Sequence, residues 1–224
     1  PVLAWTQKLS STPKTVEYLA GSYILIITYP GEVFTMDFTS SEKKVRRWHP
    51  FRKRISNHVV DRNTGRLYLV SSMDDKLIAY NMLNKKHLWK RKIPHIDNHT
   101  ALVGNTLMLL QTTGNIMALD NDSGELLESR KINRQLAGMM HHPSDTLLII
   151  TADGGVQAYT KKLEPIWKLP VNLNPNPVYT ANNDRIILAD SNGRIKAIDD
   201  KQGELQFELD VHNPIYAPLL LSGE

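Results

Sequence analysis

The 224-residue sequence contains no cysteine, and no apolar run approaches the roughly 18 residues that a membrane-spanning helix needs. Without cysteine, the chain has no disulfide, no thiol nucleophile and no thiolate metal site. A helical apolar stripe is missing as well, because the apolar residues occur in short runs such as residues 23–27 and 147–150. Runs of this length are typical of buried strands. The sequence therefore excludes disulfide-stapled and α/β folds and favours an all-β domain.

Motifs for common catalytic chemistries are also missing. The sequence holds no phosphate-binding glycine loop and no serine-hydrolase elbow. Its eight histidines show neither HxH nor HExxH spacing, although His141 and His142 are adjacent. We interpret the histidines as loop and surface residues, because a metal site needs convergent ligands. The sequence thus predicts no catalytic residue, no metal site and no small-molecule substrate.

What the sequence does contain is an internal repeat. One seven-residue phrase, polar at its ends and apolar between, occurs five times, at residues 31–37, 75–81, 114–120, 154–160 and 193–199. Its sixth residue recurs after 44, 39, 40 and 39 positions, as Met36, Tyr80, Leu119, Tyr159 and Ile198. A regular period in this range is the signature of a repeat architecture. The repeat therefore decides the fold class.

Each copy of the phrase follows a short apolar run and a polar link that contains Gly, Asn or Asp. The runs are residues 24–27, 67–70, 107–110, 147–150 and 186–188. An apolar run, a turn and an alternating strand together predict a β-hairpin. Another apolar segment precedes each hairpin, and a strand with a large residue follows it. Each repeat therefore predicts four strands.

Four strands every forty or so residues indicate an all-β fold, a β-propeller of four-stranded blades with five complete repeats and a split or partial sixth. A solenoid of stacked sheets is the structural alternative. The expected repeats are residues 11–51, 52–93, 94–132, 133–171 and 172–211. Residues 1–9 match a last strand and residues 212–224 a first strand, so both are expected in one incomplete blade. The chain is then a single propeller or a fragment of a longer one.

All four tryptophans occupy the same position of the repeat, in its last strand. The aligned residues are Trp5, Trp48, Trp89, Glu128, Trp167 and Phe207, spaced 43, 41, 39, 39 and 40 apart. A tryptophan at this position can cover the seam between neighbouring sheets, because it buries about 150–250 Å² of aromatic surface. We therefore predict structural docking roles for the aromatic residues. Glu128 breaks the pattern, so its seam should be packed differently.

The repeat resembles the tryptophan-docking motif of quinoprotein-type propellers, in which Ala-x-Asp-x-x-(Thr/Ser)-Gly-x-x-x-Trp closes a blade. Residues 118–127 and 197–207 carry this pattern, and residues 79–89 and 158–167 are degenerate copies. The chain is thus similar, over its whole length, to the quinoprotein-alcohol-dehydrogenase-like family of PQQ-like repeat propellers. WD-repeat propellers are less similar, because the Gly-His and Trp-Asp pairs are missing.

The resemblance implies a non-catalytic member of that family. Its enzymes bind pyrroloquinoline quinone and calcium and carry an adjacent cysteine pair, whereas this chain has no cysteine and no recognisable calcium constellation. We therefore expect no cofactor. The recurring Asp37, Asp120 and Asp199 are interpreted as turn residues, because a carboxylate there can accept backbone N–H bonds. The family also includes outer-membrane assembly factors and sensor domains, and it favours a location outside the cytoplasm.

A basic segment is the most suggestive local feature. Residues 43–54 contain seven Lys and Arg and no acid, and residues 85–92 form a second cluster one repeat later. The candidate residues for binding a polyanion or an acidic partner are Lys43, Lys44, Arg46, Arg47, Arg52, Lys53, Arg54, Lys90, Arg91 and Lys92. Such patches attract phosphates, nucleic acid, membranes or acidic proteins. Lysine-rich outer strands also protect sheet edges against aggregation, and this alternative stays open.

Three functions follow from these features. The leading expectation is a non-catalytic scaffold or sensor domain that binds a protein, because an incomplete blade leaves strand edges that invite pairing with a partner or a second copy. The first alternative is nucleic-acid or polyanion binding through the basic outer strands. The second is a quinone-dependent dehydrogenase-like enzyme, for which the sequence supplies no catalytic residues.

Overall fold

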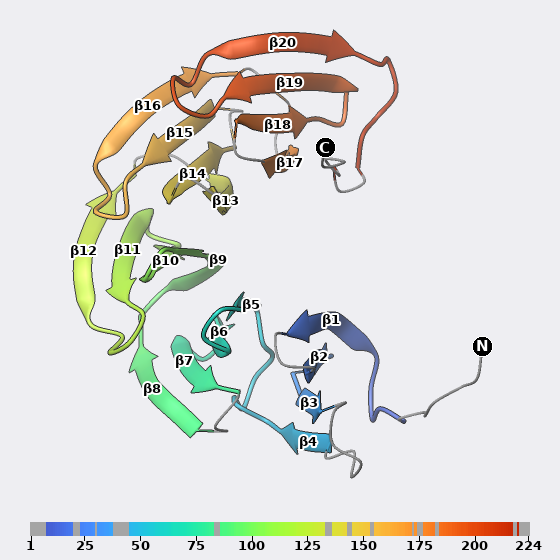
Figure 1. Cartoon of the computed structure of the whole chain (residues 1–224), viewed down its shortest axis with the longest axis vertical. Helices are drawn as coiled ribbons and strands as arrows, with labels where there is room; N and C mark the ends of the chain where they lie inside the picture. Colours follow the sequence, from blue (N-terminus) through green and yellow to red (C-terminus); the bar gives the residue numbers. More distant parts are fainter. Residues whose placement is uncertain are drawn as a thin grey trace. The chain divides into compact units, whose positions relative to one another are not determined.

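The computed structural model describes residues 8–19, 23–29, 31–37, 45–82, 86–132, 136–142, 145–152, 155–171, 173, 177–181, 184–216 and 219. These residues form twenty strands, and each run of four consecutive strands makes one antiparallel sheet (Figure 1). The chain divides into two compact units, residues 1–98 and residues 99–224. No helix among the described residues is both long and apolar enough to cross a membrane.

The first unit contains two complete sheets. The first sheet has the order β1 (Pro13–Leu19), β2 (Tyr23–Thr28), β3 (Val33–Asp37) and β4 (Val45–Trp48). The second has the order β5 (Asn57–Asp61), β6 (Arg66–Ser71), β7 (Lys76–Asn81) and β8 (Lys86–Lys92).

The remaining three sheets follow in the chain. The third consists of β9 (Ile96–Val103), β10 (Thr106–Gln111), β11 (Asn115–Asp120) and β12 (Leu126–Lys131). The fourth consists of β13 (Leu136–His142), β14 (Thr146–Thr151), β15 (Gly155–Tyr159) and β16 (Pro165–Pro170). The fifth consists of β17 (Val178–Ala181), β18 (Arg185–Ala189), β19 (Arg194–Asp199) and β20 (Leu205–Asp210). The expected all-β fold with five four-stranded repeats is confirmed. Residues 1–7 lie outside the described residues, as does most of 217–224.

Burial separates the inner strands of each sheet from its last strand. The second strands β6, β10 and β14 are almost entirely buried, as their apolar runs predict. A strand that is apolar on both faces must be covered on both. The last strands β8, β12 and β20 are exposed along nearly their whole length. Each sheet therefore ends in a solvated edge strand.

Apolar clusters join neighbouring sheets. One cluster joins the first two sheets through residues such as Leu25 and Leu69. A second joins the third and fourth sheets, with Met108 and Ile149 among its members. A third joins the fourth and fifth sheets and includes Ile186. Burial of these residues stabilises each seam by about 25 cal/mol for each Å² of apolar surface removed from water.

The turn between the third and fourth strands has the same construction in two sheets. Asp120 Oδ1 accepts the N–H groups of Asp122 and Ser123, and Asp199 Oδ1 accepts those of Lys201 and Gln202. Gly124 and Gly203 close these turns at φ values of 71° and 70°. Glycine adopts this left-handed conformation without the Cβ penalty. Asp120 and Asp199 therefore act as turn residues, whereas the residues that follow Asp37 lie outside the described ones.

Candidate functional site

The seam between the fourth and fifth sheets shows how a docking tryptophan works. Trp167 lies opposite Ala158 in the sheet and packs with the apolar cluster of this seam. Its indole Nε1–H donates to the Asp200 carbonyl of the fifth sheet at 2.8 Å. The ring lies directly on the next turn, since a Cβ added to Gly203 would stand 2.5 Å from Trp167 Cε3. Gly203 is therefore the residue on which the Trp167 ring packs, because a side chain there would strike the ring.

The seam between the third and fourth sheets lacks both parts of this arrangement, the tryptophan on one sheet and the glycine on the other. Glu128 lies opposite Ala118, the register that Trp167 holds in the fourth sheet. On the fourth sheet the turn is one residue shorter, and Leu163 stands at φ 60° where the turns of the third and fifth sheets have glycine. The Leu163 side chain is buried at 1% exposure within the seam cluster. A tryptophan ring at position 128 would meet this side chain. A tryptophan at position 128 therefore requires a glycine at position 163.

An open groove of about 710 Å³ lies at this seam, which we call the seam groove. One wall is residues 127–130 of β12, the other is the turn of residues 161–164, and Asn105 and Thr106 also line it. Arg130 bridges the two walls, because its Nη1 donates to the Leu163 carbonyl at 3.1 Å. Its guanidinium also lies 5.7 Å from the Tyr159 ring centroid. The seam at which Glu128 stands in the tryptophan position thus carries a solvent-accessible groove.

At the seam of the first two sheets, Trp48 lies two residues beyond the expected register. Arg46 pairs with Thr35, and Trp48 pairs with Val33. The two side chains share one face, so Arg46 lies 5.9 Å from the Trp48 ring and 5.8 Å from the Tyr80 ring. Trp48 contacts Tyr80 of the second sheet at a centroid separation of 5.0 Å. The longer connection before β4 accounts for the shift, because an insertion there changes which residue meets β3.

The other aromatic candidates differ in their surroundings. Trp89 lies opposite Ala79, half-buried, with its ring 6.0 Å from that of Tyr68. Trp5 lies outside the described residues. Phe207 lies opposite Ala197, the register of Trp167, yet it remains 45% exposed. Its docking role therefore stays a prediction.

Within the second unit, the fifth sheet presents an apolar face that neither of the other two sheets covers among the described residues. Cross-strand pairing places Ile187, Ala197 and Phe207 in one row and Ala189, Ile195 and Leu209 in the next. The opposite face carries Ile186, Leu188 and Ile198, which pack against the fourth sheet. Phe207 and Leu209 are 45% and 51% exposed, and Ile187 and Ile195 are half-buried. We call Ile187, Ile195, Phe207 and Leu209 the open face.

The basic candidates fall on the outer strands of the first unit. Arg46 and Arg47 belong to β4, Lys90 to Lys92 belong to β8, and residues 52–54 lie in the connection that follows β4. All eight described members of the predicted patch are exposed. Lys43 and Lys44 lie outside the described residues. Two members already have intramolecular roles, because Arg46 covers the aromatic pair and Arg47 binds a buried carboxylate. The binding role of the patch stays a prediction.

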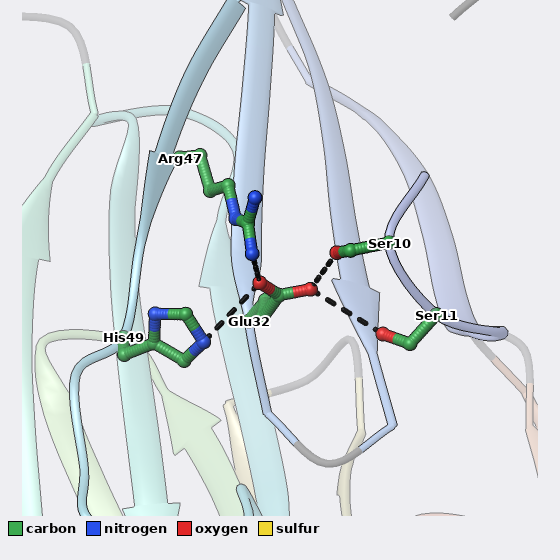
Figure 2. A network of polar contacts seen from close by, with 5 residues as sticks. All are labelled: Ser10, Ser11, Glu32, Arg47 and His49. Carbon is green, nitrogen blue, oxygen red and sulfur yellow. Dashed lines mark hydrogen bonds and ion pairs between the residues drawn. The ribbon is translucent and has the colours of Figure 1, made fainter. Parts of the chain in front are cut away.

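That buried carboxylate is Glu32, which sequence reasoning missed. Figure 2 shows Ser10, Ser11, Arg47 and His49 converging on it. The Glu32 side chain is only 5% exposed, and Ser11 Oγ and His49 Nε2 lie 3.3 and 3.2 Å from its oxygens. The Ser10 hydroxyl and then the Arg47 guanidinium hold the pKa of Glu32 below its ordinary value of 4.5, against the opposite effect of burial. The network ties residues 10–11 to β3 and β4.

The Glu32 network predicts a specific loss of stability in acid. A carboxyl whose pKa is lowered by folding stabilises the native state above its unfolded pKa, and this contribution disappears as pH falls through the folded pKa. We expect the wild type to melt above Glu32→Gln at about pH 6, and the difference between their Tm values to shrink below about pH 4. Calorimetric Tm values across this range measure the effect. A Tm difference that does not change with pH would contradict it.

No sequence signal marked Glu32 or the seam groove in advance. Glu32 is one isolated acid, and its partners lie up to 22 residues away in the chain. The groove is lined by residues of two sheets, including Leu163, which stands at the left-handed position of its turn. In the described part of the chain, no three His, Asp or Glu side chains are grouped closely enough to hold a metal ion.

Comparison with known proteins extends these observations. Residues 86–218, more than half of the chain, match the model of the family described as outer membrane protein assembly factor BamB. The crystal structure of BamB from Moraxella catarrhalis superposes with a TM-score of 0.65 at 16% identity, over 87% of this chain and 63% of that one. The WD40 domain of Pan2 from Neurospora crassa gives a TM-score of 0.68 at 10% identity, over 91% and 67%. At such identities the likeness concerns the fold alone. No curated protein matches the chain.

Proposed function

Because this chain belongs to the family of the outer membrane protein assembly factor BamB, whose members are β-propellers of PQQ-like repeats, we propose that it is a non-catalytic scaffold that binds another protein. The chain spans 63% of the length of the Moraxella catarrhalis BamB chain. We propose further that it takes part in the assembly of outer membrane proteins, as the name of the family says of BamB.

The observation that carries this proposal is the open face of the fifth sheet. Phe207 and Leu209 expose about half of their surface on a strand at the edge of the sheet. Contiguous apolar patches on a protein surface mark interaction sites. The equivalent face of the fourth sheet, with Trp167 in the register of Phe207, is covered by the fifth sheet. The open face therefore has the apolar composition of a face that packs against another sheet, and a binding partner could cover it in the same way.

A protein partner suits this face better than a small ligand. The side chains lie in two flat cross-strand rows rather than around a cavity. The outer edge of β20, which pairs with no strand among the described residues, adds backbone donors and acceptors that can pair with another strand. We infer that the partner supplies an apolar sheet face or an extended segment, in the way that neighbouring sheets cover each other within this chain.

Charged residues on the open face should abolish the scaffold function. In cells that lack this protein, we expect the amount of folded outer-membrane β-barrel protein to fall, and the wild-type gene to restore it. The double variant Phe207→Asp/Leu209→Asp should fail to restore it, because a buried unpaired carboxylate costs several kcal/mol at an interface. Heat-modifiable mobility of the barrels on gels measures the folded amount.

The matched control is Leu126→Asp/Ile166→Asp. These two residues are 55% and 48% exposed on other outer strands, and neither belongs to the open face. The control should restore the barrels as the wild type does. Circular dichroism of both purified variants checks that they fold. Full restoration by the folded Phe207→Asp/Leu209→Asp variant would refute the open face as the binding site.

The basic residues of β8 and of the connection after β4 support a second candidate function, the binding of a polyanion. Arg52, Lys53 and Arg54 are exposed and consecutive, and β8 of the same compact unit adds Lys90 and Lys92. Arg46 and Arg47 are less suitable than the sequence suggested, because they serve the aromatic pair and Glu32. Cationic side chains bind nucleic acid mainly by releasing the counterions of its phosphates.

Charge reversal tests this second function. Arg52→Glu/Lys53→Glu/Arg54→Glu should lower the affinity for fluorescent duplex DNA and reduce the slope of log K against log salt by about 3, since each neutralised phosphate contributes about 0.9. Fluorescence anisotropy at several salt concentrations measures both. Reversal of Lys131, Lys168 and Lys201, exposed lysines of the second unit, should leave the slope unchanged. Equal slopes for the two triple variants would exclude this patch.

A further inference from the structure

The seam groove combines a free strand edge with an opposing wall. Among the described residues, β12 is the terminal strand of its sheet and pairs with β11 alone, and all six of its residues are exposed. At the corresponding edge of the fourth sheet, Trp167 covers the seam and reaches the next turn. At β12 no tryptophan does so, and the edge faces the turn of residues 161–164 across the groove. A segment that pairs with this edge would lie between two walls.

The backbone of β12 already binds a carboxylate. The Ser129 N–H donates to Glu128 Oε1 at 3.0 Å, so the chain's own side chain occupies a donor of the edge strand. This N–H is the group that a paired strand would use through a peptide carbonyl. Swinging the exposed Glu128 side chain into solvent frees the donor without disturbing the seam.

The opposing wall carries positive charge. Lys161 and Lys162 are consecutive, exposed and part of the groove lining, and together they outweigh the single acid of this wall, Glu164. Arg130 is held by the Leu163 carbonyl and the Tyr159 ring and is therefore fixed in place. Leu127, which is 55% exposed, adds an apolar contact on the strand side. The groove thus offers an edge for a backbone, an apolar residue and two exposed ammonium groups.

We propose that the seam groove binds an extended acidic peptide segment of a partner protein. Its backbone adds a strand to the edge of β12, which is a common mode of peptide recognition. Alternate side chains of an added strand point to opposite faces, so one set lies against Leu127 while acidic side chains reach Lys161 and Lys162. This site is separate from the open face and does not depend on it.

A synthetic strand provides the probe. A fluorescein-labelled peptide of five Val-Glu repeats should bind the whole chain, and the matched peptide of five Val-Lys repeats should bind at least about ten times more weakly, since charge complementarity sets the choice of partner. Lys161→Glu/Lys162→Glu should weaken the Val-Glu peptide by at least about tenfold, because the attraction becomes repulsion. Lys168→Glu/Lys201→Glu, outside the groove, should have little effect.

A second variant tests the groove by shape instead of charge. Glu128→Trp/Leu163→Gly rebuilds the docking pair of the other seam and places an indole ring in the groove. It should also weaken the Val-Glu peptide by at least about tenfold while circular dichroism stays that of a folded sheet protein. The proposal is overturned if this variant binds as the wild type does, if both peptides bind equally, or if only reversal of residues 52–54 abolishes binding.

Discussion

Replacing Gly203 by valine should lower the free energy of unfolding by about 4 kcal/mol or more, a large effect for a turn on the surface of a sheet. Two costs add. A β-branched residue at φ 70° is strained by about 1–3 kcal/mol. Its Cβ would also stand 2.5 Å from Trp167 Cε3, so the indole must leave the turn. Loss of a tightly packed tryptophan costs about 3–5 kcal/mol, and less here because Trp167 is only half-buried.

A double-mutant cycle separates these two costs. Trp167→Ala removes the ring that the valine would strike, so Gly203→Val in that background should cost only the backbone strain. We therefore expect an interaction free energy of about 1–3 kcal/mol between the two substitutions. Urea unfolding of the four proteins measures it. Additive effects would mean that Trp167 does not dock on Gly203. Gly104→Val, at φ 56° in an exposed turn, is the control for backbone strain.

The sequence predicted the parts of this fold that depend on neighbouring residues and on the repeat. Short apolar runs with turn-forming links predicted the hairpins, and the period predicted five sheets of four strands. The aspartates of the turns were also foreseeable, because Asp199 bonds to N–H groups only two and three residues ahead. Such features follow from local chemistry and from alternation along a strand.

Other features depend on contacts that no spacing in the sequence reveals. The register of Trp48 depends on a connection of variable length before β4, so aligning it with Trp89 and Trp167 placed it two residues away from its position in the sheet. Glu32 became important only when the fold brought Ser10 and Arg47 to it. The open face required knowledge of which sheet faces are covered, and a repeat makes all of them look alike.

Glu128 shows the limit most clearly. The alignment predicted that its seam would be packed differently, and the structure supplies the reason. Leu163 fills the place that Gly203 holds at the seam of the fourth and fifth sheets, where the glycine leaves room for the ring. Only the pairing of sheets shows that positions 128 and 163 meet, since 35 residues separate them in the sequence.

This coupling predicts that a tryptophan can return to the third sheet only together with a glycine. Leu163→Gly alone should lower the free energy of unfolding by about 1–4 kcal/mol, because the loss of a side chain buried at 1% exposure leaves a cavity, and glycine at φ 60° relieves part of this cost as backbone strain. Glu128→Trp alone should be neutral or destabilising, because Leu163 keeps the ring off the turn. In the double variant the indole covers the vacated space and recovers a large part of the loss.

The expected signature is a favourable interaction free energy of about 1–3 kcal/mol between Glu128→Trp and Leu163→Gly. Urea unfolding of the wild type, both single variants and the double variant measures it. Glu128→Trp combined with Ile149→Val, a change elsewhere in the same apolar cluster, is the control and should be additive. If Glu128→Trp stabilises the protein as much with leucine at 163 as with glycine, the two positions are independent. In that case the open groove would need a cause other than the missing glycine, since the turn would accept the ring as it stands.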